Sequence, residues 1–286
     1  RRNDAIGARY QFELTESDIP SLKSRETTMS LSQEYNTAGL LVRSGIFFEQ
    51  RRRFHNNSFL FTEMNYFPAR WDDLNSEGHG DFRINPRRQG GFFWASDNSR
   101  AIRVAHGIFF EDEQIDGQVR LYESELNWRP NDRVAVELKL RYRERSNWLL
   151  YDHDAEFTTF SARTWEPELK LDFFFTATQQ IRISAQWVGI KAFEKNRWRV
   201  PAAGGSLITD PAEATDTPRD FSISRLVFQA RYRWGIAPLS DLFVVYTRGS
   251  NLDSDPTQQF GDLLRSSWSK RAIDVFVIKL RYRLGN

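Results

Sequence analysis

The chain has 286 residues, with 40 basic and 38 acidic side chains, 14% aromatic residues and a formal net charge of +2. This balance argues against the clustered basic excess that is typical of a nucleic-acid surface, so nucleic acid is not expected as a partner. The absence of cysteine excludes disulfide frameworks and thiolate metal sites. No run of about 18 apolar residues occurs, which excludes a transmembrane helix at the level of sequence.

Strand-like segments follow one another along the whole chain, and no amphipathic helix of three turns is predicted. The expected strands lie at residues 5–14, 26–36, 39–50, 55–67, 88–97, 100–111, 117–128, 132–145, 158–175, 179–193, 220–235, 240–249 and 271–284. Alternation of apolar and polar residues is clear in many of them, for example at 5–14 and 179–193, and weak in others, such as 26–36.

The segment RVAVELKLRYR, residues 133–143, shows the alternation most clearly. Five apolar residues, from Val134 to Tyr142, occupy every second position, and Ala135, Glu137, Lys139 and Arg141 lie between them. A period of two places these sets on opposite faces of one strand. Charged side chains facing lipid would cost about 2–4 kcal/mol each near the midplane. Apolar side chains left in water would forgo about 1.5–3 kcal/mol each. One face is therefore expected to contact water, and the other a dry environment.

The connections between strands differ in length in a regular way. Short turns are expected at 96–99, 128–132, 176–180 and 235–240, and longer polar connections at 146–158, 194–219 and 249–270. From residue 128 onward the two kinds alternate, as they do in a membrane barrel with short periplasmic turns and long external loops. The competing interpretation is a soluble β-sandwich, because Greek-key folds imitate this pattern over a few strands.

The predicted fold is all-β: a transmembrane antiparallel up-and-down β-barrel of about 14 strands that occupies residues 1–286 as one domain. Bacterial single-chain barrels have an even number of strands, whereas thirteen segments are found here. Either one strand is missing from the prediction or the barrel continues outside this sequence. The chain starts at RRNDAIG without a signal peptide, so a mature chain or a fragment is expected.

Two C-terminal segments carry a family resemblance. The stretch QARYRWGIAPLSDLFVVYTRGSN (229–251) and the closing VIKLRYRLGN (277–286) resemble the end of a family of Gram-negative outer-membrane proteins. Members pair a module resembling a carbohydrate-binding module with a C-terminal β-barrel and are catalogued mainly as a domain of unknown function. The resemblance implies that this chain is the C-terminal barrel portion of a longer protein. Outer-membrane proteins commonly end on an aromatic residue, and this chain departs from that pattern at Gly285 and Asn286. The resemblance transfers no functional residues.

Charged residues on the polar side of the predicted strands are the candidates for lining the lumen. They are Glu137, Lys139, Arg141, Arg143, Arg182, Arg231, Arg233, Lys279, Arg281 and Arg283. Arginine recurs in pairs at alternate positions, and guanidinium groups bind carboxylate and phosphate in a bidentate manner. The cations form either a salt-bridge network with Glu137, Glu168 and Asp172 or a basic path for anions.

Aromatic residues in the long connections are candidates for surface contacts. Trp148, Trp198, Phe260 and Trp268 could stack on sugar rings at the cell surface. The alternative is that they anchor the loops at the level of the lipid headgroups, as aromatic belts do.

Two further constellations carry weaker signals. The DHDAE stretch at 152–156 offers oxygen and nitrogen ligands for a divalent cation, but acidic residues are common in external loops. A serine hydrolase would need a serine, a histidine and an orienting group in reach of one another. Ser146 with His153, and Ser99 with His106, are conceivable pairs without a supporting motif. No enzymatic activity, metal or cofactor is therefore expected.

The function expected from the sequence is passive permeation, or surface binding and uptake, of polar solutes in the bacterial outer membrane. The solute is expected to be anionic or a glycan, and the glycan suggestion comes from the resemblance alone. Lipid and lipopolysaccharide are the expected surroundings, and the sequence does not identify any partner chains. The alternatives are a structural barrel within an outer-membrane complex and a soluble β-sandwich that binds glycans.

Overall fold

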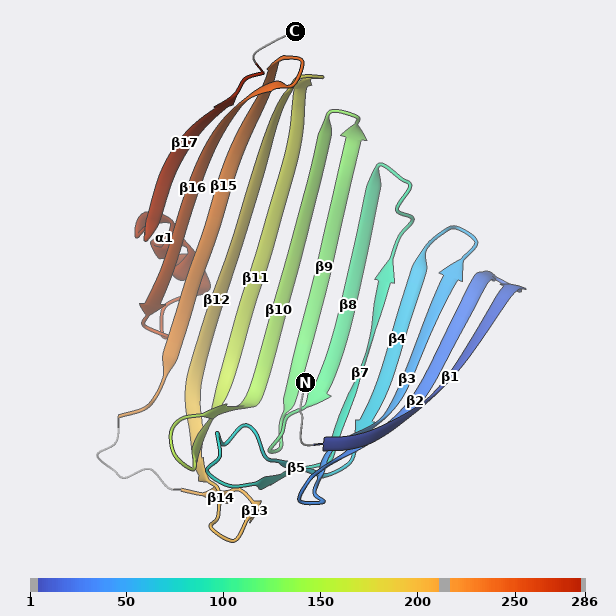
Figure 1. Ribbon diagram of the computed structural model, residues 1–286, viewed down its shortest axis with the longest axis vertical. Helices are drawn as coiled ribbons and strands as arrows, with labels where there is room; N and C mark the ends of the chain where they lie inside the picture. Colours follow the sequence, from blue (N-terminus) through green and yellow to red (C-terminus); the bar gives the residue numbers. More distant parts are fainter. Residues whose placement is uncertain (1–4, 211–216, 284–286) are drawn as a thin grey trace.

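The computed structural model describes residues 5–210 and 217–283 as one large antiparallel sheet, a small second sheet and a short helix (Figure 1). The main sheet is a meander, because its hydrogen-bonded strands follow one another in the same order as along the chain. Its thirteen strands are β1 (Ala5–Ile19), β2 (Leu22–Asn36), β3 (Leu41–Phe54), β4 (Phe59–Phe67), β7 (Arg87–Ala95), β8 (Ile102–Asp112), β9 (Gln118–Asn131), β10 (Val134–Tyr151), β11 (Glu156–Thr176), β12 (Gln179–Arg199), β15 (Phe221–Ala237), β16 (Ser240–Ser254) and β17 (Ile273–Arg281).

These thirteen strands correspond one to one to the thirteen predicted segments. The all-β class and the antiparallel up-and-down order are confirmed. The additional strand that an even count required is not on this path in the described residues, where only the two-residue β14 (Ile208–Thr209) joins the sheet beside β12.

The main sheet is open rather than closed into a barrel. Strands β1 and β17 lie at opposite edges (Figure 1), and neither has a second neighbour among the described residues. The predicted ring of hydrogen bonds is therefore absent from the described chain. The thirteen strands form a twisted wall whose two edges expose backbone donors and acceptors.

The register gives the main sheet two chemically distinct faces. We call polar face the side that carries Glu137, which lies beside Lys170 of β11. We call apolar face the side that carries Leu138, which lies beside Leu169. Pairing continues this division from β1 to β17 because directly opposed residues point to the same side.

Large apolar side chains are exposed along the apolar face. They include Tyr10, Phe12, Leu14, Met29, Leu31, Ile46, Met64, Phe92, Ile108, Phe110, Tyr122, Leu140, Leu169, Trp234, Phe276, Ile278 and Leu280. An exposed apolar surface of this extent is unusual for a monomeric soluble protein. A second layer that would complete a β-sandwich does not cover this face in the described part of the chain, where only one short helix packs on it.

Several strands extend further than the sequence predicted. Residues 146–158 were expected to form a long loop, but β10 continues to Tyr151 and β11 begins at Glu156. A bulge between Arg145 and Trp148 interrupts the regular register there. Strict alternation ends at this bulge while backbone pairing continues, so a prediction based on alternation ended the strands too early.

The long connections form a compact structure at their end of the sheet, which we call the cap. Strands β5 (Arg70–Asp72) and β6 (Phe82–Ile84) come from the connection after β4, and β13 (Gly205–Ser206) comes from the connection after β12. Figure 1 places β5, β13 and β14 together at the foot of the sheet. The core of the cap consists of the buried residues Phe82, Ile84, Phe157, Val200 and Leu207.

A ten-residue helix, α1 (Phe260–Ser269), lies in the connection between β16 and β17. Residues 249–270 were expected to form a loop, and this helix was not predicted from the sequence. A helix of ten residues is only marginally stable in isolation. The sheet supplies the surface on which it packs. None of the helical structure in the described residues is long and apolar enough to cross a bilayer.

The cap predicts a matched pair of stability effects. Phe82→Ala removes a ring that is 1% exposed and packs 5.0 Å from the ring of Phe157. This cavity should destabilise the cap by about 3–5 kcal/mol, and the connection 68–86 should become sensitive to limited proteolysis. Leu74→Ala, at a 57% exposed position of the same connection, is the control and should leave the cleavage rate unchanged. Equal protection of both variants would contradict a packed cap.

Candidate functional site: the polar face of the sheet

The centre of the polar face is a network of ion pairs between neighbouring strands. Arg141 of β10 donates to Glu123 of β9 over 2.7 Å and to Glu166 of β11 over 3.2 Å. A single guanidinium thereby joins three strands. The two acceptors lie on opposite sides of Arg141, because the register places one on each neighbouring strand.

The network continues along β10 and β11 towards the short turns. Glu137 lies 3.2 Å from Lys139 and 3.5 Å from Lys170. Lys170 also contacts Glu168 over 2.6 Å. Each carboxylate of this group has a cationic neighbour, so the negative charges are compensated within the sheet.

The next strands carry an excess of positive charge. Arg182 donates to Asp172 over 2.5 Å, and Arg233 donates to Asp241 over 2.9 Å. Of the predicted lumen-lining cations on these strands and directly after β17, those without an ion pair to another described residue are Arg231, Lys279, Arg281 and Arg283. Arg231 lies directly beside Arg182, whereas Lys279 and Arg281 lie on β17, on the other side of β16.

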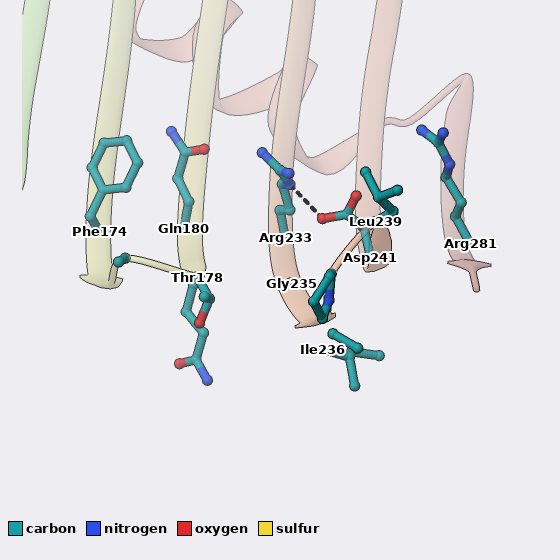
Figure 2. A pocket seen from close by; sticks show the side chains of 13 residues that line it. Phe174, Thr178, Gln180, Arg233, Gly235, Ile236, Leu239, Asp241 and Arg281 are labelled. Atoms are coloured by element: carbon teal, nitrogen blue, oxygen red, sulfur yellow. Dashed lines mark hydrogen bonds and ion pairs between the residues drawn. The ribbon is translucent and has the colours of Figure 1, made fainter. Parts of the chain in front are cut away.

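Part of this basic region lines a pocket at the short-turn end of the sheet (Figure 2). The pocket has a volume of about 740 Å³ and lies between the turns at 176–180 and 235–240. Figure 2 shows Arg233 and Asp241 directed towards each other, with Arg281 on the adjacent strand. Phe174 and Gln180 line the opposite side. Guanidinium groups beside amide and hydroxyl groups suit an anionic or strongly polar solute.

The remaining candidate, Arg143, lies nearer the cap. It lines a groove of about 350 Å³ together with Glu63, Glu111 and Arg145. Beyond the end of β8, Glu113 is 8% exposed, and its Oε1 atom has no hydrogen-bond partner among the described residues. Burial raises the pKa of Glu113 above its usual range, although nearby Arg145 opposes this effect.

The four aromatic candidates make contacts with the sheet or the cap. Trp198 packs against the cap core and donates from Nε1 to Oγ1 of Thr159 over 3.1 Å. The ring of Trp148 lies 6.1 Å from that of Phe221. Phe260 and Trp268 belong to α1, and both contact the apolar face. Among the four, only Trp268 exposes a large fraction of its surface, 47%.

The acidic group at 152–156 is engaged in ion pairs. Ligand atoms of Asp152, His153 and Glu156 lie within 4.8 Å of one another. Arg219 contacts Asp152 and lies 3.8 Å from Glu156, and Arg199 lies 3.9 Å from Glu156. Arginine therefore already neutralises these carboxylates, and the group has no further feature that would favour a cation.

The conceivable serine and histidine pairs are not assembled. The hydroxyl of Ser146 accepts from the backbone of Gln118 over 2.7 Å, while His153 faces acidic neighbours. Ser99 donates to Asp97 over 2.8 Å. His106 pairs instead with Ser124 at 3.0 Å on the apolar face, and no described carboxylate or amide orients its ring.

The structure thus defines an all-β protein built on one antiparallel sheet, with a polar face rich in charge and an exposed apolar face. The chain belongs to the family described as a domain of unknown function, DUF5916, which it matches over residues 6–285. The predicted resemblance to a family of unknown function is confirmed, whereas the outer-membrane setting and the carbohydrate-binding module stay predictions. A comparison with curated proteins gave no match.

The buried carboxyl near the cap predicts a pH-dependent stability. Since burial raises its pKa, the folded state binds the Glu113 proton more tightly than the unfolded state. The resulting stabilisation is complete below the unfolded pKa and is lost as the pH rises through the folded pKa. Glu113→Gln should therefore stabilise the protein at neutral pH, measured by chemical denaturation, and this gain should vanish in acid. A gain that did not change with pH would show that Glu113 is not the titrating group.

Proposed function

We propose that this chain forms part of the wall of an aqueous pore in a bacterial outer membrane, and that polar, preferentially anionic, solutes pass through the pore passively. In this arrangement the apolar face contacts acyl chains and the polar face lines the water. The observation that carries the proposal is the length of the apolar band on each strand.

The apolar band has the same length on several strands. It spans nine residues from Val134 to Tyr142 on β10, and equally nine from Trp165 to Phe173 on β11. The bands at 181–189 on β12 and 226–234 on β15 also have nine residues. A β-strand needs about 9–11 residues to cross the hydrocarbon layer when it is tilted. A soluble sheet has no reason to repeat this length.

Aromatic residues mark the end of the band nearest the cap. The ring of Tyr142 lies 6.3 Å from that of Tyr122 and 4.7 Å from that of Trp165. Charged residues follow immediately on the same face, where Glu144 and Arg163 are directly opposite each other and lie 3.7 Å apart. Aromatic girdles followed by charge are typical of the two interfaces of a membrane barrel.

The ion pairs of the polar face suit the wall of a water-filled interior. Most of the candidate cations of β10 and β12 are paired, which favours the salt-bridge network over a continuous basic ladder. The unpaired cations Arg231, Lys279 and Arg281 are concentrated at the short-turn end. Their positive field would favour anions there without requiring a dedicated binding site.

The strand count constrains how the pore wall is completed. In an antiparallel meander of thirteen strands, the first and last strands run in the same direction. Direct pairing of β1 with β17 would therefore be parallel, whereas antiparallel closure needs one more strand or another odd number. Unpaired backbone groups in lipid cost several kcal/mol each. We propose that strands outside this chain fill the gap, in line with the resemblance to the C-terminal part of a longer barrel.

The assignment of faces predicts opposite tolerance at two adjacent positions. Leu138→Arg places a charge in the middle of the apolar band and should lower folding stability in phospholipid vesicles by about 2–4 kcal/mol. Lys139→Leu changes the polar face of the same strand and should have a much smaller effect. Both are measured by urea unfolding in vesicles. Equal losses in the two variants would refute the proposed orientation in the membrane.

The unpaired cations predict the sign of ion selectivity. The protein in planar bilayers should conduct ions with a preference for anions, and Arg231→Glu combined with Lys279→Glu should shift the reversal potential towards cations. Arg100→Glu, in the exposed turn between β7 and β8, is the matched control and should not shift the potential. Bilayers that stay non-conducting would instead support a structural barrel in a larger assembly.

A further inference from the structure

Helix α1 lies on the apolar face, the face that the proposed function assigns to lipid. Its residues Leu263 and Ser267 are completely buried, and Leu263 packs against Trp187 and Leu226 of the sheet. Gly189 makes this packing possible, because a Cβ atom there would collide with the Trp187 ring and lie 3.1 Å from Phe260. The helix is therefore part of the folded structure and not a loose loop.

Buried hydrogen bonds fix α1 to the sheet. The hydroxyl of Ser224 donates to the Leu263 carbonyl over 3.0 Å and lies 2.6 Å from the Ser267 hydroxyl. The Trp187 indole donates to the same Ser224 oxygen over 2.9 Å. Since these polar groups satisfy one another inside an apolar surface, they define one position for the helix.

Arg248 of β16 contacts the C-terminal end of α1. Its guanidinium donates to the Trp268 carbonyl, and its Cζ atom lies 5.0 Å from the centre of the Trp268 ring. A cation at the C-terminal end of a helix interacts favourably with the unpaired carbonyl groups and with the negative end of the helix dipole. At the other end, Lys191 lies 5.5 Å from the ring of Phe260. Both cations therefore lie on the apolar face beside the helix.

The outward side of α1 combines apolar and charged residues. Leu264 is 39% exposed and Trp268 is 47% exposed, and they lie one helical turn apart on the same side. Arg265 and Asp262 form an exposed ion pair at 3.1 Å. Trp187 and Leu226, beneath the helix, lie at the end of the nine-residue bands that faces the long connections.

We infer that α1 is an interfacial helix that inserts Leu264 and Trp268 at the boundary between headgroups and acyl chains, in the leaflet on the side of the long connections. The inference rests on the proposed function, because it takes the apolar face to be embedded in lipid. The exposed apolar residues of α1 continue the apolar surface of the sheet, and the charged residues lie where headgroups and water begin. Tryptophan is favourable at this depth, because its ring contacts acyl chains while its indole N–H reaches the polar headgroups.

Site-directed spin labelling in phospholipid vesicles tests this inference, and the absence of cysteine makes single-cysteine variants straightforward. Leu264→Cys reports on the helix, Arg265→Cys on its polar side, and Leu169→Cys on the middle of the apolar band. Accessibility to oxygen, which partitions into acyl chains, is compared with accessibility to a water-soluble nickel chelate. We expect a deep lipid position for residue 169, a shallow lipid position for 264 and an aqueous position for 265.

The three labels separate failure of the inference from failure of the proposed function. A label at 169 that is freely accessible to the nickel chelate would overturn the membrane assignment and the inference with it. A deep label at 169, together with a label at 264 as accessible to the chelate as the label at 265, would overturn only the inference. Because the Leu264 and Arg265 side chains are partly or largely exposed, replacing them removes little packing, and circular dichroism verifies the strand content of each variant.

Discussion

The alternation of side chains along paired strands is the constraint on which the rest of this structure depends. Successive residues point to opposite sides of a strand, and the register carries that division unchanged into each neighbour. A shift of one residue in any pair would move charged residues such as Lys139 to the face occupied by Leu138 and Leu169. The two faces are therefore a property of the whole hydrogen-bonded wall, and each strand depends on the correct register of its neighbours.

This constraint explains why the chain is dense in charge and still nearly neutral. A wall that presents one entire face to water, and must remain ordered, benefits from opposite charges directly across strand pairs. Arg141 shows the consequence, because it contacts acidic residues on both neighbouring strands. The excess positive charge is left at β15 and β17, where the acidic neighbours are fewer. Near neutrality of the chain thus coexists with a local field on one part of the polar face.

The sequence was sufficient to predict thirteen strands and their two faces, since both follow from a period that is visible in the residues themselves. The sequence also indicated Glu137, Glu168 and Asp172 as ion-pair partners, and these contact Lys170 and Arg182. The partners of Arg141, Glu123 and Glu166, were not predicted, because they depend on the register between neighbouring strands. The cap strands have only two or three residues, and no periodicity exists over such lengths. Helix α1 was missed because its stability comes from contacts with Trp187 and Ser224. Closure was inferred from a general requirement rather than from a pattern in the chain, so the sequence did not decide whether the ring of strands closes within this chain or continues outside it.

The two ends of the sheet are built differently, and this asymmetry gives the protein a direction. At the short-turn end, tight turns leave a pocket with unpaired positive charge. At the other end, the strands continue past the apolar band to the cap, and α1 packs on the last residues of the band itself. In the proposed membrane, solutes entering from the side of the long connections would encounter the cap before the basic region. The packed cap would then restrict access at one end, and charge would set selectivity at the other. Different residues determine the two properties, so substitutions could alter one without the other.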